Sequence, residues 1–159
     1  MTPKEPTWDV KSQFKTPEES PGYLLAQLTL LWQRKLKKVL DPLDLTHTQF
    51  VLLASIGWLS AKNDDTTQID IADFNNFDRM MVSKVLRTLE TKKLISRQEH
   101  KTDTRAKTIK LTSNGKKAMQ LGITAVEKAD VEFFETLGTK LPSFNTSMVK
   151  LIEANKNDD

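Results

Sequence analysis

The chain has 159 residues, a formal net charge of +3, a hydrophobic fraction of 38% and no cysteine. This length suits one domain, or one domain with added oligomerisation segments. The missing cysteines exclude disulfides, thiolate metal ligands and thiol nucleophiles, and they are typical of a cytoplasmic protein. The N-terminal residues lack the apolar core of a signal peptide, and no apolar run approaches the length of a membrane span.

The N-terminal part of the chain predicts an arm followed by two helices. Residues 1–20 are rich in proline and charge and show little periodicity, so we expect a weakly structured arm. Apolar residues recur at helical spacing over 21–40. The pair Asp41-Pro42 ends that pattern, because proline disfavours a helical conformation at the residue before it. Thr46 is placed to cap a second helix.

The next segment predicts two short helices joined by a tight turn. Thr66 or Thr67 caps the first of them, and residues 75–77 make the turn because asparagine tolerates left-handed backbone geometry. Asp78 is well placed to cap the following helix, which we expect over 79–92. Two short helices, a turn between them and a basic second helix describe a helix-turn-helix.

A charged hairpin follows, and positive charge is concentrated around it. Residues 94–99 and 106–111 each suit a strand, and a charged connection joins them. The segment 78–117 holds twelve Lys or Arg and four Asp or Glu, a local balance of +8, so the remaining residues together carry −5. Such a concentration is what a polyanion-binding surface requires, because each neutralised phosphate releases counterions. A solvated charged face is the alternative interpretation.

The C-terminal part predicts two helices with large apolar faces. Thr112 caps a helix expected over 113–137, Gly138 and Pro142 break it, and a last helix is expected over 143–155. These helices carry more apolar residues than one small domain can cover, so we expect them to pack against a second copy of the chain. In the alternative, they fold back as the core of a monomer. The apolar residues are Val126, Phe133, Phe134, Leu137, Phe144, Met148, Leu151 and Ile152.

The helix at 79–92 has two distinct faces. An apolar stripe suited to the core consists of Val82, Val85, Leu86 and Leu89. A second face, spaced at i, i+3, i+4 and i+7, consists of Met80, Ser83, Lys84 and Arg87, with Arg79 near the start of the helix. A helix in the major groove needs donors near its N-terminal end for base edges and cations for phosphates. An ordinary amphipathic helix with a solvated face is the alternative.

With these residues in place, the chain resembles the MarR family of bacterial winged-helix transcription regulators. The resemblance covers roughly residues 22–155 and is specific over 66–115. The last matching segment contains the family's Asp-x-Arg wing signature as Asp103 and Arg105. The matching segments are DLTHTQFVLLASIG (44–57), TTQIDIADFNNFDRMMVSKVLRTLETKKLISR (66–97) and KTDTRAKTIKLTSNG (101–115).

The resemblance implies a fold that is mainly α with a small β wing. It places a winged helix-turn-helix at 46–111 and dimerisation helices at 21–45 and 112–159. It implies a homodimeric, ligand-responsive repressor on a palindromic operator in double-stranded DNA, with an aromatic or phenolic small molecule as a possible effector. Trp32 and Trp58 would flank the effector crevice, although tryptophan on an apolar helical face is more often core. No cofactor, metal or membrane partner is expected.

The resemblance also assigns DNA-facing residues one by one. They are Arg79, Met80, Ser83, Lys84 and Arg87 in the basic helix, and Lys101, Arg105 and Lys107 in the hairpin. Asp103 is expected to orient Arg105, whose guanidinium can enter a minor groove. Lys93 departs from the family pattern, which commonly has glycine there. A left-handed lysine costs about 1 kcal/mol of strain, unless the turn takes another shape.

An enzyme has little support in the sequence. His47 is expected on the surface at the start of the second helix. His100 lies in the hairpin, where it would be exposed or contact a phosphate when protonated. The sequence contains no phosphate-binding glycine loop, metal-ligand cluster or nucleophile with a matching base. The main alternative to a DNA-binding regulator is a winged-helix module that binds an acidic protein without reading DNA sequence.

Overall fold

The computed structural model describes residues 10–156, and the chain divides into two units between Arg34 and Lys35. Residues 1–9, where the predicted arm begins, lie outside the described residues. The first unit contains the 3₁₀ helix η1 (Pro17–Glu19) and the larger part of helix α1 (Pro21–Leu40). The helix ends at the predicted position, and a 3₁₀ turn begins at Asp41.

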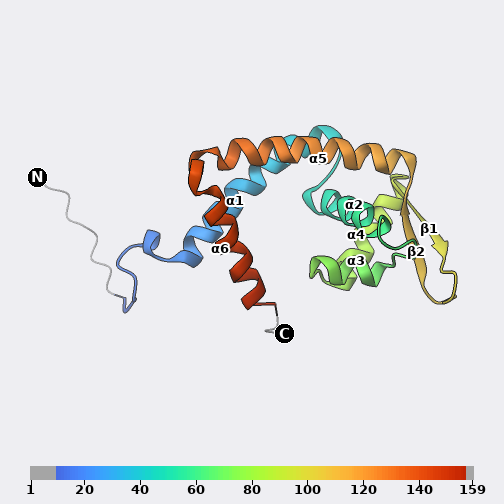
Figure 1. The fold of residues 1–159 in the computed structure, drawn as a ribbon, viewed down its shortest axis with the longest axis horizontal. Helices are drawn as coiled ribbons and strands as arrows, with labels where there is room; N and C mark the ends of the chain where they lie inside the picture. Colours follow the sequence, from blue (N-terminus) through green and yellow to red (C-terminus); the bar gives the residue numbers. More distant parts are fainter. Residues whose placement is uncertain (1–9, 157–159) are drawn as a thin grey trace, which may run out of the picture. The chain divides into compact units, whose positions relative to one another are not determined.

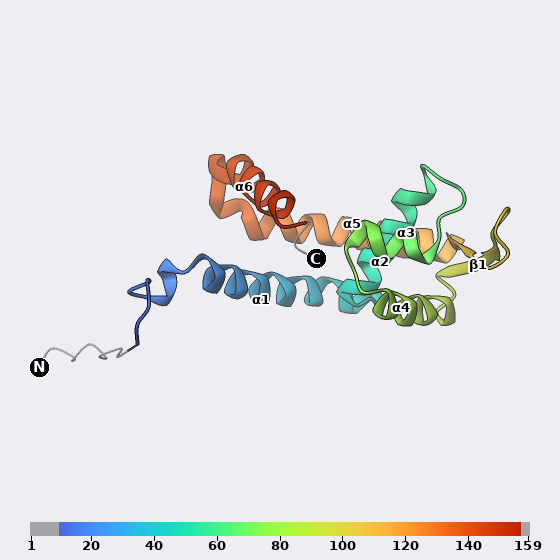
Figure 2. The same ribbon diagram turned by 90° about the horizontal axis from the view of Figure 1, so that it is seen from below.

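The second unit contains the end of α1 and all later elements (Figure 1). Within this unit, α2, α3, α4 and the β-hairpin gather at one end of the long helix α5, and α6 follows its other end. The hairpin extends beyond the helices, as Figure 2 shows from below. The elements are η2 (Asp41–Leu43), α2 (His47–Ser60), α3 (Gln68–Asn75), α4 (Arg79–Thr91), β1 (Ile95–Glu99), β2 (Lys107–Leu111), α5 (Ser113–Phe134), η3 (Glu135–Lys140) and α6 (Leu141–Ala154).

Side-chain caps set the starts of the helices, as the sequence predicted. The Thr46 hydroxyl accepts from the Gln49 amide, and the Gln49 side chain accepts from the Thr46 amide, which completes a capping box on α2. Thr67, rather than Thr66, caps α3 in the same way with Asp70. The backbone carbonyl of Thr66 instead accepts from Ile109 in β2 at 2.8 Å. This bond attaches the base of the hairpin to the start of α3.

The turn of the helix-turn-helix forms as predicted. Asn76 has φ 51° and ψ 45°, the left-handed conformation that asparagine tolerates. Asn75 connects two helices, because its Oδ1 accepts from Ser55 of α2 at 3.0 Å and its Nδ2 donates to the carbonyl of Ile71. Asp78 then caps α4 by accepting from the Met81 amide at 2.8 Å. The relative placement of α2, α3 and α4 therefore has polar as well as apolar support.

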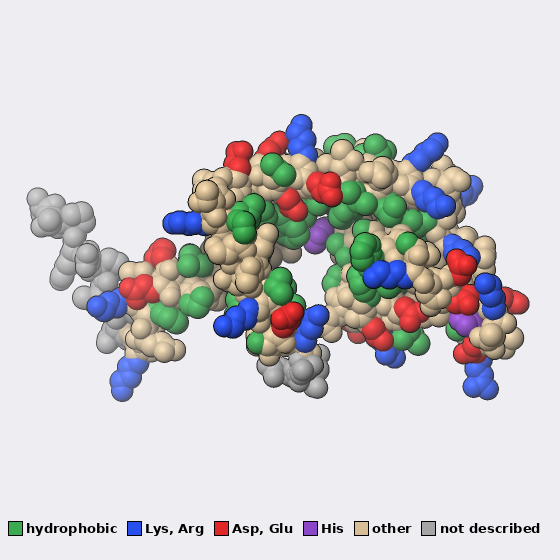
Figure 3. Space-filling view, viewed as in Figure 1, with side chains coloured by type: hydrophobic (Ala, Val, Ile, Leu, Met, Phe, Trp, Pro, Cys, Tyr) green, Lys and Arg blue, Asp and Glu red, His purple; other side chains and the backbone are tan. Residues whose placement is uncertain are grey.

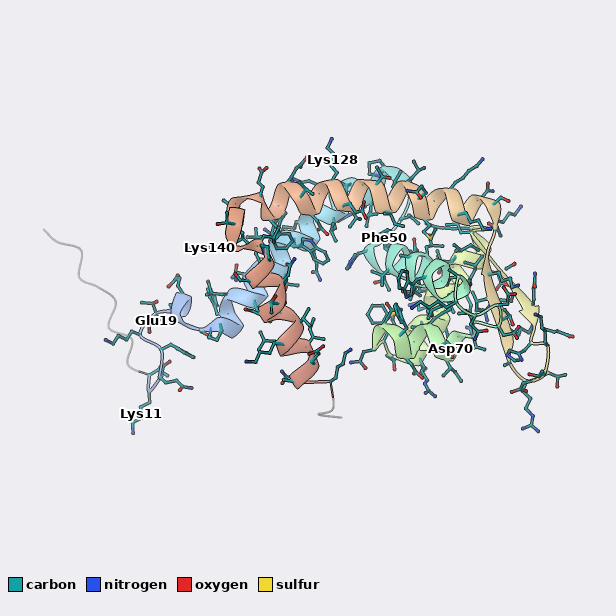
Figure 4. The ribbon with its side chains drawn as sticks, viewed as in Figure 1. Lys11, Glu19, Phe50, Asp70, Lys128 and Lys140 are labelled. Carbon is teal, nitrogen blue, oxygen red and sulfur yellow. The ribbon has the colours of Figure 1, made fainter. Side chains whose placement is uncertain are left out.

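The core of the second unit lies among α2, α3, α4, the hairpin and the end of α1. The predicted stripe of α4 is buried except for Val85, which is half-buried. Phe50 of α2 faces α5 (Figure 4), where it packs so closely on Gly122 that a Cβ there would lie 2.6 Å from the ring. The side chains with less than 2% exposure include Leu36, Leu40, Leu52, Leu53, Ile56, Ile71, Val82, Leu86, Leu89 and Ile109.

A close junction joins α4, β1 and α5. Lys93, which follows α4, has φ 59°, so the left-handed lysine considered from the sequence is realised. Its carbonyl accepts from the Thr112 hydroxyl at 2.7 Å, and the carbonyl of Leu94 accepts from the Thr112 amide at 3.1 Å. Gly115 lies directly over Leu94, where a Cβ would come 1.8 Å from the carbonyl oxygen. Only glycine fits this contact without backbone movement.

The C-terminal helices differ from the prediction at their ends. Helix α5 ends at Phe134 instead of 137, and α6 begins at Leu141 instead of 143. Pro142 does not break a helix but lies in the first turn of α6, where proline is tolerated because that turn requires no amide donor. Gly138 does mark the break, with φ 50° and ψ −125°. Val126, predicted for the intermolecular face, is buried within the unit.

We expect Gly115→Ala to lower the free energy of unfolding by about 3 kcal/mol or more, because the new methyl group would collide with a backbone carbonyl that cannot rotate away. Urea unfolding at a fixed protein concentration measures the change. Gly22→Ala is the matched control, since the nearest atom to its Cβ lies 4.0 Å away and alanine favours a helix. Equal stability of the Gly115→Ala protein and the wild type would contradict the close junction.

Candidate nucleic-acid interface

The exposed face of α4 carries the residues that the sequence predicted. Arg79, Lys84 and Arg87 are exposed, Ser83 is half-buried, and the side chain of Met80 is 82% exposed. The opposite face is anchored, because Val82, Leu86 and Leu89 are inaccessible to solvent. Burial of one face thus fixes which side chains the helix presents outward. This outward face combines cations with short polar and thioether groups.

Arg79 forms an ion pair with a residue of the neighbouring helix α3. Its Nη2 atom lies 3.5 Å from Oδ1 of Asp73 on α3, and both side chains are largely exposed. An exposed pair at this distance contributes about 0–1 kcal/mol, so the guanidinium can leave Asp73 for another anion. Asp73 therefore lies beside the Arg79 guanidinium near the start of α4, but it binds this group only weakly.

Lys92 belongs to the basic segment but is held inside the fold. Its Nζ donates to the backbone carbonyl of Asp44 and to Oε1 of Gln49 at 3.3 Å, and it lies 3.0 Å from the Asp44 carboxylate. Gln49 is itself buried and completes the cap of α2. The lysine thus ties the end of α4 to the turn before α2. The count of basic residues in this segment therefore includes at least one lysine that is not free on the surface.

The hairpin, residues 95–111, is the predicted wing. Its strands are antiparallel, with Ile95 opposite Leu111 and Glu99 opposite Lys107. An isolated bridge between Thr67 and Thr108 attaches β2 to the start of α3. Ile95 and Ile109 are buried at its base, so the wing has an apolar anchor and a polar tip.

A second contact attaches the wing to α4. The Nε atom of Arg97 in β1 lies 3.1 Å from Oε2 of Glu90, as an ion pair without the alignment of a hydrogen bond. The Arg97 side chain is mostly buried, so this arginine supports the wing rather than its outer surface. Arg97 of β1 and Lys92, which follows α4, therefore serve the fold.

The wing tip carries the predicted cations. Lys101, Arg105 and Lys107 are exposed, and Asp103 lies between them. Asp103 contacts Arg105 through the backbone, because its Oδ1 accepts from the Arg105 amide at 2.9 Å. Figure 3 shows lysine and arginine side chains gathered over the hairpin and the adjoining end of α5. Such a surface can bind phosphate groups along a polyanion.

The two tryptophans belong to different units. Trp58 is not a core residue, because it is 56% exposed and its ring lies 4.4 Å from Nζ of Lys62. Trp32 is half-buried and belongs to the first unit. Described residues contain no group of three or more acidic, histidine or cysteine side chains that could hold a metal ion, and no helix among them is long and apolar enough to cross a membrane.

His47 lies in a different environment from the one predicted. It is half-buried at the start of α2, and this burial lowers its pKa below the ordinary value of 6.5, an effect that the charge of Asp130 on α5 partly offsets. Because the unfolded chain then binds the proton more tightly, this group reduces folding stability as the pH falls below about 6.5. The sequence offered no signal for the effect of Asp130, since this residue is distant from His47 in the sequence.

Comparisons with known proteins agree with this geometry. A winged-helix domain family described as ArnR1-like matches residues 41–132. The uncharacterized HTH-type transcriptional regulator YdcH of Bacillus subtilis (strain 168) is 40% identical over 142 residues, which span 89% of this chain and 96% of that protein.

Two solved structures share the fold. MepR of S. aureus, in complex with DNA, has a TM-score of 0.76 and 28% identity, and covers 85% of this chain and 98% of its own. The transcriptional repressor CouR from Rhodococcus jostii RHA1, bound to a 23-mer DNA duplex, has a TM-score of 0.76 and 23% identity over 91% of this chain and 99% of its own. The wing motif, the fold and the close relative lead to one assignment: the chain belongs to the MarR family of winged helix-turn-helix transcriptional regulators.

Proposed function

We propose that this protein is a homodimeric, ligand-responsive repressor that binds a palindromic operator in double-stranded DNA and acts in the cytoplasm. The observation that carries the proposal is the polarity of α4, which buries Val82, Leu86 and Leu89 completely and presents Arg79, Lys84 and Arg87 to solvent. A helix anchored on one face and cationic on the other suits the major groove. MepR, at 28% identity, is solved in complex with DNA, which supports the same role here.

Each predicted contact has a proposed role. Arg79, Ser83, Lys84 and Arg87, with Met80 beside them, face base edges and the neighbouring phosphates from the major groove. Arg105 enters the minor groove from the wing tip, where the negative potential is concentrated. Lys101 and Lys107 contact phosphates. Residues 46–111 thus form the DNA-reading region, and the arm at 1–20 has no assigned contact.

A second copy of the chain is the proposed partner of the terminal helices, at 21–45 and 112–159. Helix α6 contains no buried residue, and Val149, Leu151 and Ile152 are all more than half exposed. An unpaired apolar face of this kind is unstable in water and is typical of an interface. Phe134 of α5 has ring contacts with Phe133 and Phe144, at centroid distances of 4.9 and 6.1 Å, so the aromatic side chains already support the start of α6.

The effector is proposed only as a chemical class. CouR, which shares the fold, is also solved with p-coumaroyl-CoA bound. An aromatic or phenolic molecule is therefore the proposed effector class for this protein. Trp32 and Trp58 are left as individual candidates, since they lie in different units and Trp58 is engaged with Lys62.

Selection from a random pool of DNA duplexes tests the function. We expect an enriched palindrome whose half-sites lie about one helical turn, roughly 10 base pairs, apart, because two recognition helices are related by a two-fold axis. Affinity for the enriched duplex should fall steeply with salt as phosphate contacts are screened. Binding that is equally strong on every duplex, with no enriched sequence, would instead favour the module that binds acidic proteins.

Light scattering tests the dimer. We expect a mass about twice 18.1 kDa at micromolar concentration, because burial of the α6 face requires a partner. The variant Leu151→Glu with Ile152→Glu should dissociate or aggregate and should bind the enriched duplex more weakly, since two linked readers bind better than one. Lys150→Glu, on the same turn of α6, is the control and should stay dimeric. A monomeric wild type, or a monomeric variant with full DNA affinity, would contradict this role of α6.

A further inference from the structure

The tip of the wing turns without glycine, proline or a residue in the left-handed conformation. Residues 100–106 have the sequence HKTDTRA, which contains neither glycine nor proline. None of these residues has a positive φ, which among described non-glycine residues occurs only at Asp44, Asn76 and Lys93. No residue of the tip therefore fixes the turn by its own backbone preference. The geometry must come from hydrogen bonds.

Two side chains supply most of these bonds. Nδ1 of His100 accepts from the backbone amides of Thr102 at 3.3 Å and Asp103 at 3.2 Å, and the Thr102 hydroxyl lies 3.3 Å from the same atom. Asp103 Oδ1 then accepts from the Arg105 amide at 2.9 Å. Backbone bonds close the loop, from the Ala106 amide to the Asp103 carbonyl and from the His100 amide to the Ala106 carbonyl.

The chemistry of these donors fixes the role of the imidazole. A backbone amide can only donate, so Nδ1 must present its lone pair, and the ring proton is assigned to Nε2. An imidazole protonated on both nitrogens would direct an N–H group at the amides of Thr102 and Asp103. In the free protein, His100 therefore acts through the hydrogen-bond acceptor at Nδ1.

We propose that His100 is a positioning residue for DNA binding. By holding the amides of Thr102 and Asp103, it places the Asp103 carboxylate where it accepts from Arg105, and so sets the direction in which Arg105 leaves the tip. The inference rests on the proposed DNA-binding function, but its first consequence, a shaped wing tip, exists in the free protein.

Three substitutions of His100 test whether this residue acts as a hydrogen-bond acceptor or as a positive charge. His100→Asn keeps an acceptor that can take amides two and three residues ahead, as in an Asx-turn, and carries no charge. His100→Lys carries a charge but no acceptor, and His100→Ala carries neither. Thr104→Ala, at the same tip, is the control that leaves both His100 and Asp103 in place.

The first measurement is hydrogen exchange of the Thr102, Asp103 and Arg105 amides in the full-length protein without DNA. We expect the Asn and control variants to exchange like the wild type, and the Lys and Ala variants to exchange about fivefold or more faster, as the loss of one ordinary hydrogen bond predicts. Unchanged exchange in the Ala variant would overturn the proposal.

The second measurement is the affinity for the enriched duplex. The Asn variant should bind like the wild type, and the Lys and Ala variants should both bind about fivefold more weakly. The opposite ranking, with Lys like the wild type and Asn like Ala, would make His100 a phosphate contact and overturn the proposal. Equal affinity for all variants would overturn it too. A wild type that binds no duplex at all would remove the DNA-binding function alone, since exchange without DNA still decides what His100 holds.

Discussion

The contact between Gly115 and the carbonyl of Leu94 is the constraint on which the other functional elements depend. It lies where α4 has ended, β1 begins and α5 starts, so it sets the placement of a helix, a wing and the long C-terminal helix together. Thr112 reinforces it by bonding to the carbonyl of Lys93 and by capping α5. The left-handed Lys93 makes the sharp turn at a cost of about 1 kcal/mol. A change in this junction would alter the angle between α4 and the wing.

Around this junction, several side chains of α4 and the wing are buried or paired, and the others face outward. The apolar stripe of α4 is buried, Lys92 is bonded to Gln49 and the Asp44 carbonyl, and Arg97 is paired with Glu90. The exposed cations of the basic segment include those on the outward face of α4 and at the tip of the wing, together with Lys93, Lys116 and Lys117. We propose that this surface recognises a DNA sequence. Such recognition requires the wing tip to be as well ordered as the helix. We assign the ordering of the tip to the acceptor side chains of His100 and Asp103.

Much of the fold could be predicted because its signals are local. The caps at Thr46 and Asp78 and the left-handed Asn76 depend on residues within a few positions of one another, and the two strands are joined by one short connection. The predictions that were wrong concern residues whose contacts come from distant parts of the sequence. Lys92 resembles any other surface lysine until Gln49 folds against it, and His47 becomes half-buried only in the folded unit. Val126 was assigned to a dimer face because helical spacing cannot tell an intramolecular partner from an intermolecular one. The start of α6 was predicted two residues too late because Pro142 can begin a helix as readily as it can stop one.

We propose above all that the outward face of α4 reads base sequence. The most direct test measures the affinities of Lys84→Ala and Arg87→Ala for the enriched duplex and for its single-base-pair variants. The measurements are made at several salt concentrations. Lys128→Ala, on the exposed side of α5, is the control (Figure 4). We expect each α4 variant to lose about 1–3 kcal/mol of binding free energy on the enriched duplex and to discriminate less at particular base pairs, while binding by the control stays unchanged. Unchanged affinity of both α4 variants on every duplex would remove this helix from the interface and contradict the account.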